Sequence, residues 1–296
     1  MTDILLPFQV AAGAVRGRMV RLGPAVESIL AGHAYPPPVA RLLAETLALA
    51  AALAGGLKYD GIFALQAQGD GPVSLVLADV TSAGALRGYA RFDAARLAML
   101  GKAPSLKALM GKGHLAFTVD QGPDTDRYQG IVALEGADLA ESVELYFRQS
   151  EQLDTAVKAA VSAEGGWRAA ALVAQRMPAA MTGQPILVGD EAEDIWRRAA
   201  ILMNSATAQE MLDPAVAPQD LLWRLYHAEQ VEAFEPRRLE ARCRCSEAKV
   251  VATLRSFPAD EISGLADDDG KIVVTCEFCR VAYTFTAADL AFDHSA

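Results

Sequence analysis

All four cysteines of this chain lie in its C-terminal part, as Cys243-x-Cys245 and Cys276-x-x-Cys279. Residues i and i+2 of an extended segment share a face, and a tight Cys-x-x-Cys turn brings two sulfurs to one side. Four converging thiolates form a soft, tetrahedral site that suits Zn²⁺. Because no cysteine lies outside these pairs, we favour one shared metal site over two unrelated pairs of buried or disulfide-bonded cysteines.

The composition is that of a globular protein with one or two domains. The chain has 296 residues, of which 52% are hydrophobic and 22% charged, so it is long enough to bury a substantial core. Its formal net charge is −10. This acidic balance argues against a nucleic-acid-binding protein, whose phosphate contacts require clustered Lys and Arg.

No feature of the sequence indicates export or membrane insertion. The N-terminal residues lack the basic and then apolar regions of a signal peptide. The most apolar stretch, from Val39 to Leu57, carries Arg41 and Glu45, so we expect a core helix and not a membrane span. We therefore expect a cytoplasmic protein, in a compartment where thiols stay reduced and a cysteine cluster binds metal.

Residues 1–180 are predicted to form an α+β domain in which a hairpin-built sheet packs against helices. Strand-like alternation is expected over 8–22, 62–68, 73–77, 115–119 and 128–134, with a hairpin turn at Gly69-Asp70-Gly71-Pro72 and another around Gly122-Pro123-Asp124. Helices are expected after Pro24 and over 39–57, 139–149 and 153–161. Residues 167–175 fit either a strand or a helix edge.

Residues 181–238 are predicted to form a metastable helical linker. Helical periodicity covers 190–204, 207–212 and 219–227, with a capping box at Thr207 and Glu210 and breaks at Pro214 and Pro218. Helices this short are marginal alone and need a neighbour to persist. The alternative is an ordinary helical part of the first domain.

Residues 239–296 are predicted to form a small zinc-binding domain. A helix follows Ser246, two strands flank the second cysteine pair, and Thr286 with Asp289 suits a capped final helix. A domain of this size is only marginally stable by itself, so bound metal would supply much of its folding free energy.

The cysteine spacing, together with segments along the whole chain, resembles the redox-regulated heat-shock chaperones of the 33-kilodalton chaperonin family. The other matching segments are 33–37 with 42–45, 68–72, 128–132, 150–152 and 234–236. The resemblance implies a substrate-holding domain, a metastable linker and a zinc-binding redox switch. It maps the four zinc thiolates onto Cys243, Cys245, Cys276 and Cys279. Arg280 stands where we expect a smaller polar residue.

The resemblance also implies an ATP-independent holdase with unfolded client proteins as partners and no catalytic residue. The reduced form would hold one Zn²⁺ per chain and be inactive, and disulfide formation with zinc release would activate it. Because zinc loss leaves neighbouring sulfurs, we expect the disulfides Cys243–Cys245 and Cys276–Cys279. Exposed apolar surface would also permit a homodimer when oxidised.

Two other classes of function remain open. A zinc-dependent thiol–disulfide enzyme would need an open coordination position or a partner acid or base, and no recognisable motif contains His33, His114, His227 or His294. A zinc-ribbon module that binds nucleic acid or protein would use the local basic patch of Arg237, Arg238, Arg242 and Arg244. We interpret this patch as a solvated face, given the acidic balance of the chain.

Overall fold

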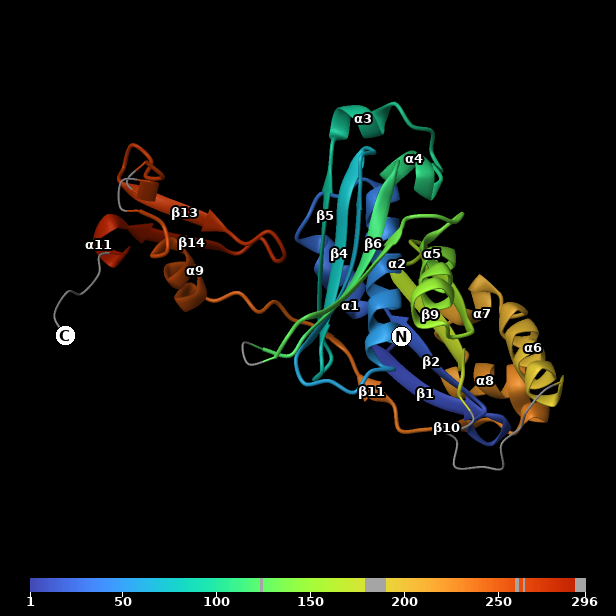
Figure 1. Ribbon diagram of the computed structural model, residues 1–296. Coiled ribbons are helices and arrows are strands. Elements are labelled where there is room, and N and C mark those ends of the chain that lie inside the picture. Colours follow the sequence, from blue (N-terminus) through green and yellow to red (C-terminus); the bar gives the residue numbers. More distant parts are fainter. Residues whose placement is uncertain (123–124, 179–189, 259–260, 263, 291–296) are drawn as a thin grey trace. The chain divides into compact units, whose positions relative to one another are not determined.

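The computed structural model describes residues 1–122, 125–178, 190–258, 261–262 and 264–290 (Figure 1). The chain divides into two compact units, the N-terminal unit Met1–Ala241 and the C-terminal unit Arg242–Ala296. The predicted α+β class is confirmed. Part of the turn predicted around 122–124, the start of the predicted linker and His294 lie outside the described residues.

The N-terminal unit contains two six-stranded sheets. Sheet A has the order β10 (Glu232–Ala233), β1 (Ile4–Val10), β2 (Val15–Leu22), β9 (Arg168–Arg176) and β8 (Thr155–Ser162), and β11 (Arg237–Arg238) also pairs with β1. Sheet B has the order β12 (Glu240–Ala241), β5 (Ala85–Phe92), β4 (Val73–Thr81), β3 (Ile62–Gly69), β6 (Gly113–Asp120) and β7 (Tyr128–Ala133). The predicted antiparallel pairs β3–β4 and β6–β7 are confirmed.

The predicted apolar core helix is α2 (Pro37–Ala54), which lies between the two sheets and contacts strands of both (Figure 1). It begins at Pro37, whose missing N–H costs nothing in a first turn. It is the one described helix long and apolar enough to cross a membrane, but 78% of that stretch is buried inside the protein. Its Leu and Ala side chains join one apolar core with both sheets.

Shorter helices lie before and after α2 in the chain. They are α1 (Pro24–Ala31), α3 (Ala94–Ala98), α4 (Leu106–Met110) and α5 (Leu139–Tyr146). Three of them begin at capping side chains, Asp93, Ser105 and Asp138, whose oxygens accept backbone N–H groups of the first turn. A π-helical turn, Phe147–Glu151, follows α5 and ends at Gln152, which has a left-handed backbone.

Three helices cover the opposite face of sheet A: α6 (Asp190–Asn204), α7 (Ala208–Leu212) and α8 (Pro218–Tyr226) (Figure 1). All three lie within the predicted linker, and their contacts place them in the N-terminal unit. Alternate residues of the strands face them, because successive side chains of a strand point to opposite faces. A second apolar core forms there, containing Leu6, Phe8, Met19, Leu172, Met203 and Leu225 among others.

The helix predicted over 153–161 is wrong, because the structure has strand β8 there. Leu and Ala favour a helix by local propensity, but every residue from Thr155 to Ser162 pairs with a residue of β9. Residues 167–175, which fitted either element, lie in strand β9 except for Trp167. Tertiary pairing therefore overrides the local preference in this segment.

The C-terminal unit is much smaller. Its described elements include α9 (Glu247–Leu254), a hairpin of β13 (Lys271–Thr275) and β14 (Ala282–Thr286), and α11 (Ala287–Leu290). Among the residues of this unit that the structure describes, the buried apolar side chains of the core are Leu254, Ile262, Ile272, Phe285 and Leu290. So small a core provides little stability by itself.

Candidate metal centre and linker contacts

The local fold of the C-terminal unit positions both cysteine pairs. Cys276 and Cys279 occupy the turn between β13 and β14, where the Cys276 N–H donates to the Val281 carbonyl at 2.9 Å. Cys243 and Cys245 lie on the segment before α9, and Ser246 caps that helix by accepting the Lys249 N–H. The cap fixes where the chain turns from extended to helical, immediately after Cys245.

The four sulfurs converge. All four Sγ atoms lie within 4.8 Å of one another, with Cys243 and Cys276 at 3.7 Å and Cys245 and Cys279 at 3.3 Å. A tetrahedral metal with metal–sulfur distances of about 2.3 Å requires sulfurs about 3.8 Å apart. The donor set and its spacing therefore fit a soft tetrahedral cation, and the four cysteines are free thiols. The residues predicted as ligands are thus brought together.

The protonation of the cluster shows what a cation would contribute. At Cys243 burial raises the pKa, but hydrogen bonds from the Cys245 N–H and the other thiols outweigh it, and the pKa falls to about 7. Burial, together with the hydrogen bonds of the cluster, raises the pKa of Cys279 to about 12. The folded cluster thus favours the thiolate at Cys243 and disfavours it at Cys279. A bound metal ion would stabilise the thiolate form.

Tyr283 is a further residue of the site that the sequence analysis missed. Its hydroxyl donates to the Cys245 sulfur at 3.2 Å, and this hydrogen bond is the main reason that its pKa rises to about 12. Tyr283 and the buried Phe285 alternate along β14 and therefore share a face. The alternation could have indicated that Tyr283 shares the face of Phe285, but its contact with Cys245 depends on the tertiary fold.

Arg280, which directly follows the second pair, adopts a left-handed backbone conformation with φ of 61°. Its N–H donates to the Cys276 carbonyl at 2.9 Å and closes the turn. Glycine adopts this conformation at no steric cost, whereas a side chain with a Cβ is strained. The backbone strain of the turn therefore lies at Arg280, the position where we expected a smaller polar residue.

The histidines are not brought into any metal site that the structure describes. His33 stacks on Tyr35 with ring centroids 4.6 Å apart, His114 lies in β6, and the His227 ring nitrogen Nδ1 contacts the Trp223 carbonyl at 3.2 Å. Among the described residues, the only group of three or more potential ligands is the four-cysteine cluster.

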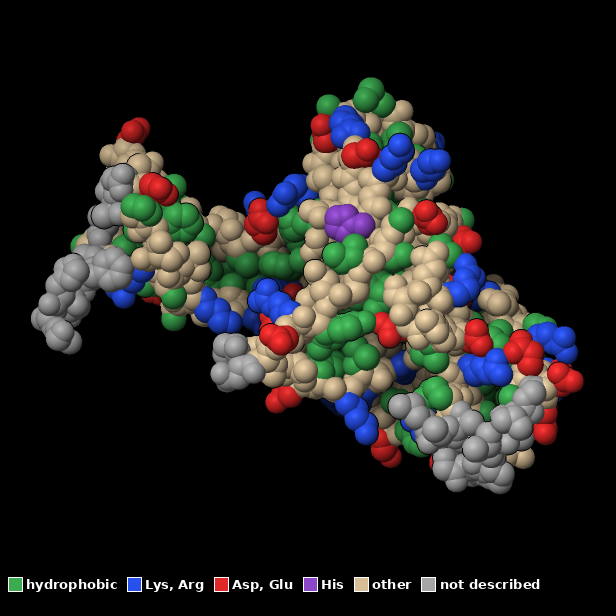
Figure 2. Space-filling model, viewed as in Figure 1, with side chains coloured by type: hydrophobic (Ala, Val, Ile, Leu, Met, Phe, Trp, Pro, Cys, Tyr) green, Lys and Arg blue, Asp and Glu red, His purple; other side chains and the backbone are tan. Residues whose placement is uncertain are grey.

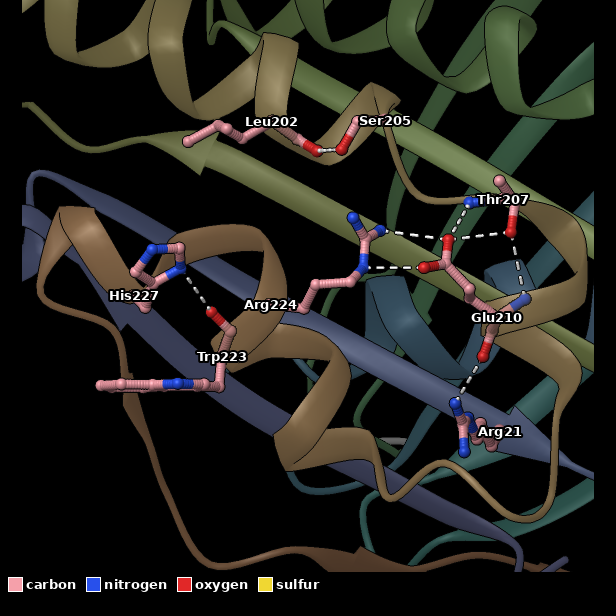
Figure 3. A network of polar contacts seen from close by, with 8 residues as sticks. All are labelled: Arg21, Leu202, Ser205, Thr207, Glu210, Trp223, Arg224 and His227. Atoms are coloured by element: carbon pink, nitrogen blue, oxygen red, sulfur yellow. Dashed lines mark hydrogen bonds and ion pairs between the residues drawn. The ribbon is translucent and has the colours of Figure 1, made fainter.

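A second polar arrangement holds α7 on sheet A (Figure 3). Buried Arg21 of β2 donates to the carbonyl oxygens of Glu210 at 2.8 Å, Asp213 at 3.1 Å and Val216. The predicted capping box is confirmed, because Thr207 and Glu210 satisfy each other's backbone N–H groups. Arg224 of α8 pairs with the Glu210 carboxylate at 2.8 Å. These contacts join α7, α8 and the sheet.

Two more cations of sheet A bind helix ends in the same way. Lys158 donates to the Asn204 carbonyl at 2.7 Å and Arg168 to the Leu212 carbonyl at 3.3 Å. Carbonyl groups at a helix C-terminus lack intrahelical partners and carry partial negative charge, so cations stabilise them. In the apolar core beneath these helices, Phe8 of β1 stacks on Tyr226 of α8 with ring centroids 5.7 Å apart.

The described residues of the N-terminal unit form no continuous basic track on the face drawn in Figure 2. On the face drawn in Figure 2, Lys and Arg side chains are interspersed with Asp and Glu over the described residues. A phosphate backbone requires a continuous field of one sign.

Comparisons with known proteins give a consistent result along the chain. A sequence profile of the family described as Hsp33 protein matches residues 3–286. A "33 kDa chaperonin" of Caulobacter vibrioides (strain NA1000 / CB15N) is 41% identical over 295 residues, covering 96% of this chain and 94% of its own length. Another, of Ectopseudomonas mendocina (strain ymp), is 42% identical over 294 residues, covering 98% and 95%. The crystal structure of a 33 kDa chaperonin from Thermotoga maritima matches with a TM-score of 0.82 over 98% of this chain and 97% of that chain, at 22% identity, which shows a shared fold.

Proposed function

Because the chain belongs to the Hsp33 family of chaperones, we propose that it is a redox-regulated, ATP-independent holdase that protects unfolding proteins in the cytoplasm. The observation that carries this proposal is the convergence of four free thiols in a unit whose buried core is very small. Such a unit depends on its metal site for stability. Oxidation of the thiols, which removes the metal ligands, would therefore unfold the unit.

In the reduced chain we assign Cys243, Cys245, Cys276 and Cys279 as ligands of one Zn²⁺. Zinc, when bound, provides the positive charge that lets four neighbouring thiolates coexist. The Tyr283 hydroxyl donates to the Cys245 sulfur, which orients this ligand and withdraws negative charge from it. No catalytic residue is assigned, in keeping with the relatives' name of chaperonin.

Peroxide would activate the protein by converting ligands into disulfides. One thiolate attacks a peroxide oxygen, giving a sulfenic acid and, after protonation, one water. A second thiol then attacks that sulfur and releases another water, so that two cysteines lose two electrons and the peroxide gains them. Disulfides no longer provide the thiolate ligands, and zinc leaves with the folding free energy that it contributed.

We propose the pairs Cys243–Cys245 and Cys276–Cys279. In the folded unit sulfurs of different motifs lie close together, Cys243 and Cys276 at 3.7 Å and Cys245 and Cys279 at 3.3 Å, so reduced geometry alone does not select these pairs. Once a sulfenic acid has removed one ligand and the unit opens, however, closing a loop within one motif costs less conformational entropy than bridging the long separation between motifs. Peptide mapping of the oxidised protein tests this, and a dominant Cys243–Cys276 or Cys245–Cys279 peptide would contradict it.

The N-terminal unit would respond through the chain that joins the two units. Strand β12 ends at Ala241, two residues before Cys243. Unfolding after this point frees the chain on one side of β12, which is preceded along the chain by β11 and β10 and then by α8, α7 and α6. These helices cover the apolar face of sheet A. Uncovering that face would provide a surface for unfolding clients, and it would also favour a homodimer of the oxidised form.

An aggregation assay with a zinc readout tests the proposal. Light scattering of heat-denaturing citrate synthase is measured with the reduced protein and with the peroxide-treated protein, while a metallochromic dye reports released zinc. We expect the oxidised form alone to suppress scattering, after release of about one zinc per chain. Equal suppression by the reduced, zinc-bound form would refute redox control, and turnover of model disulfides would favour an enzyme.

A further inference from the structure

Residues 232–241, which we call the edge segment, close an edge of each sheet. Within this segment β10 and β11 pair antiparallel with β1, and β12 pairs parallel with β5. Figure 1 shows β10 and β11 running beside β1 at the end of sheet A. An open sheet edge presents unpaired N–H and C=O groups that can accept another strand. The edge segment fills this position in the folded chain.

The hydrogen bonds of β1 show which of its groups face this edge. The Phe234 N–H donates to the Pro7 carbonyl at 2.9 Å, and the Leu239 N–H to the Asp3 carbonyl at 3.1 Å. Backbone groups of alternate residues point to opposite sides of a strand. The odd-numbered residues of β1, including Leu5 and Gln9, therefore face the edge segment, and the even-numbered residues face β2.

The two short strands β10 and β11 of the edge segment pair with β1 through their backbone. The side chains of both residues of β10 and both residues of β11 are exposed, and Phe234 between them is 43% exposed. Among its side chains, Glu232 accepts from Gln9 at 2.7 Å, Arg237 donates to the Gly55 carbonyl at 3.0 Å, and Leu239 is buried in the core around α2. Pairing through main-chain groups depends little on sequence, so this edge is suited to many different extended chains.

We propose that in the oxidised protein the vacated edge of β1 captures an extended segment of an unfolded client as an added strand. This inference rests on the proposed function, because release of the C-terminal unit is what would free the edge segment. The added strand would place alternate side chains beside Leu6, Phe8 and Val10, which line the apolar face beneath α6–α8. The preferred client segment is therefore extended, with apolar residues at every second position.

A second copy of β1 fits this edge less well. Pro7 lies at the centre of β1 and has no N–H to donate to a strand added at this edge. An antiparallel pair of two β1 strands centred on this residue would set two prolines opposite each other. A client strand brings its own donors and can match the acceptors of Asp3 and Pro7.

Residue-resolved amide hydrogen exchange on the full-length protein tests the proposal, with reduced carboxymethylated α-lactalbumin as a permanently unfolded probe. On oxidation we expect the Leu5 and Gln9 amides to exchange at least about tenfold faster, because their partners leave. Addition of the probe should restore their protection. The Leu6 and Phe8 amides, which face β2, should stay protected throughout and show that β1 remains folded.

The variant Gln9→Pro removes one edge-facing N–H without touching the ladder to β2, and Gln9→Ala is the matched control. Both variants lose the side-chain contact with Glu232, but only the first loses the backbone donor. We expect oxidised Gln9→Pro to bind the probe about tenfold more weakly than Gln9→Ala, the effect of one hydrogen bond.

The outcomes separate this inference from the proposed function. If the oxidised protein binds the probe while the Leu5 and Gln9 amides stay open and the two variants bind alike, the edge is not the site and the proposed function stands. If the oxidised protein does not bind the probe at all, the proposed function fails and this inference fails with it. Protection that rises with protein concentration without probe would assign the edge to a second copy and overturn the client assignment.

Discussion

The two units of this chain differ in what stabilises them. The N-terminal unit buries apolar side chains on both faces of sheet A, with α2 on one face and α6–α8 on the other. The C-terminal unit buries a handful of apolar side chains and places four thiols together. Burial of apolar surface is indifferent to oxidants, whereas metal–thiolate binding is not. The protein thus combines a redox-insensitive unit with a redox-sensitive one.

The two faces of sheet A differ in a related way. The face toward α2 is covered by one long helix in a continuous apolar core. The other face is covered by three shorter helices whose ends depend on hydrogen bonds from Arg21, Lys158 and Arg168. Short helices have little stability of their own. We therefore expect α6–α8 to be the first part of the N-terminal unit to open.

The largest expected effect on zinc binding is that of Cys276→Ser. Structural zinc binding is worth about 10–16 kcal/mol at pH 7, so one ligand of four contributes about 3 kcal/mol and its loss lowers zinc affinity about 100-fold. The C-terminal unit should lose amide protection while α2 keeps it. Chelator competition and hydrogen exchange measure both effects. Glu277→Ser, an exposed change in the same turn, is the control, and full zinc affinity in Cys276→Ser would show that Cys276 is not a ligand.

Two substitutions that create a cavity, one beneath α6–α8 and one around α2, should differ in their effect on client aggregation. Met203 of α6 and Leu47 of α2 are both fully buried, Met203 in the core beneath α6–α8 and Leu47 in the core around α2. Truncation of either to Ala should cost about 2–5 kcal/mol. We expect reduced Met203→Ala to suppress client aggregation partly without oxidation, because it loosens α6. Reduced Leu47→Ala should lose stability without this gain, and equal behaviour of both variants would remove the distinction between the faces.

Glu45 gives the N-terminal unit a pH dependence of its own. Burial raises its pKa to about 7, and the charge of Asp138 adds to the shift. The folded state therefore holds a proton that the unfolded state has released, and stability falls as pH rises from about 4.5 through 7. The loss is at most about 3 kcal/mol. Urea unfolding of wild type and Glu45→Gln at pH 5 to 8 measures it, since only wild type should lose this contribution. Parallel curves would contradict it.

Arg280→Gly should have the smallest effect and the opposite sign. Glycine removes the strain of the left-handed backbone at this position, which is worth about 1 kcal/mol. Zinc release under peroxide should be slower in this variant by about fivefold. Arg280→Lys keeps the strain and is the control. Faster release in the glycine variant would show that the Arg280 side chain, not its backbone, matters.

Local patterns were enough to predict several features. Short-range spacing and turn chemistry predicted the shared site of the four cysteines, the β3–β4 hairpin and the Thr207–Glu210 capping box. Local patterns did not predict strand β8, because this segment is a strand only through its pairing with β9. Tyr283 near Cys245 and Arg21 at α7 were missed because each contact joins residues far apart in sequence. The two-residue strands of the edge segment are too short to show a period.

The central claim is that oxidation unfolds the C-terminal unit and then releases α6–α8 from sheet A. Hydrogen exchange of the reduced and peroxide-treated protein, followed element by element, tests it most directly. We predict that oxidation removes protection from α9, β13 and β14 and from α6–α8, and that α2 keeps its protection. If the peroxide-treated protein suppresses client aggregation while α6–α8 stay protected and zinc stays bound, the claim is wrong.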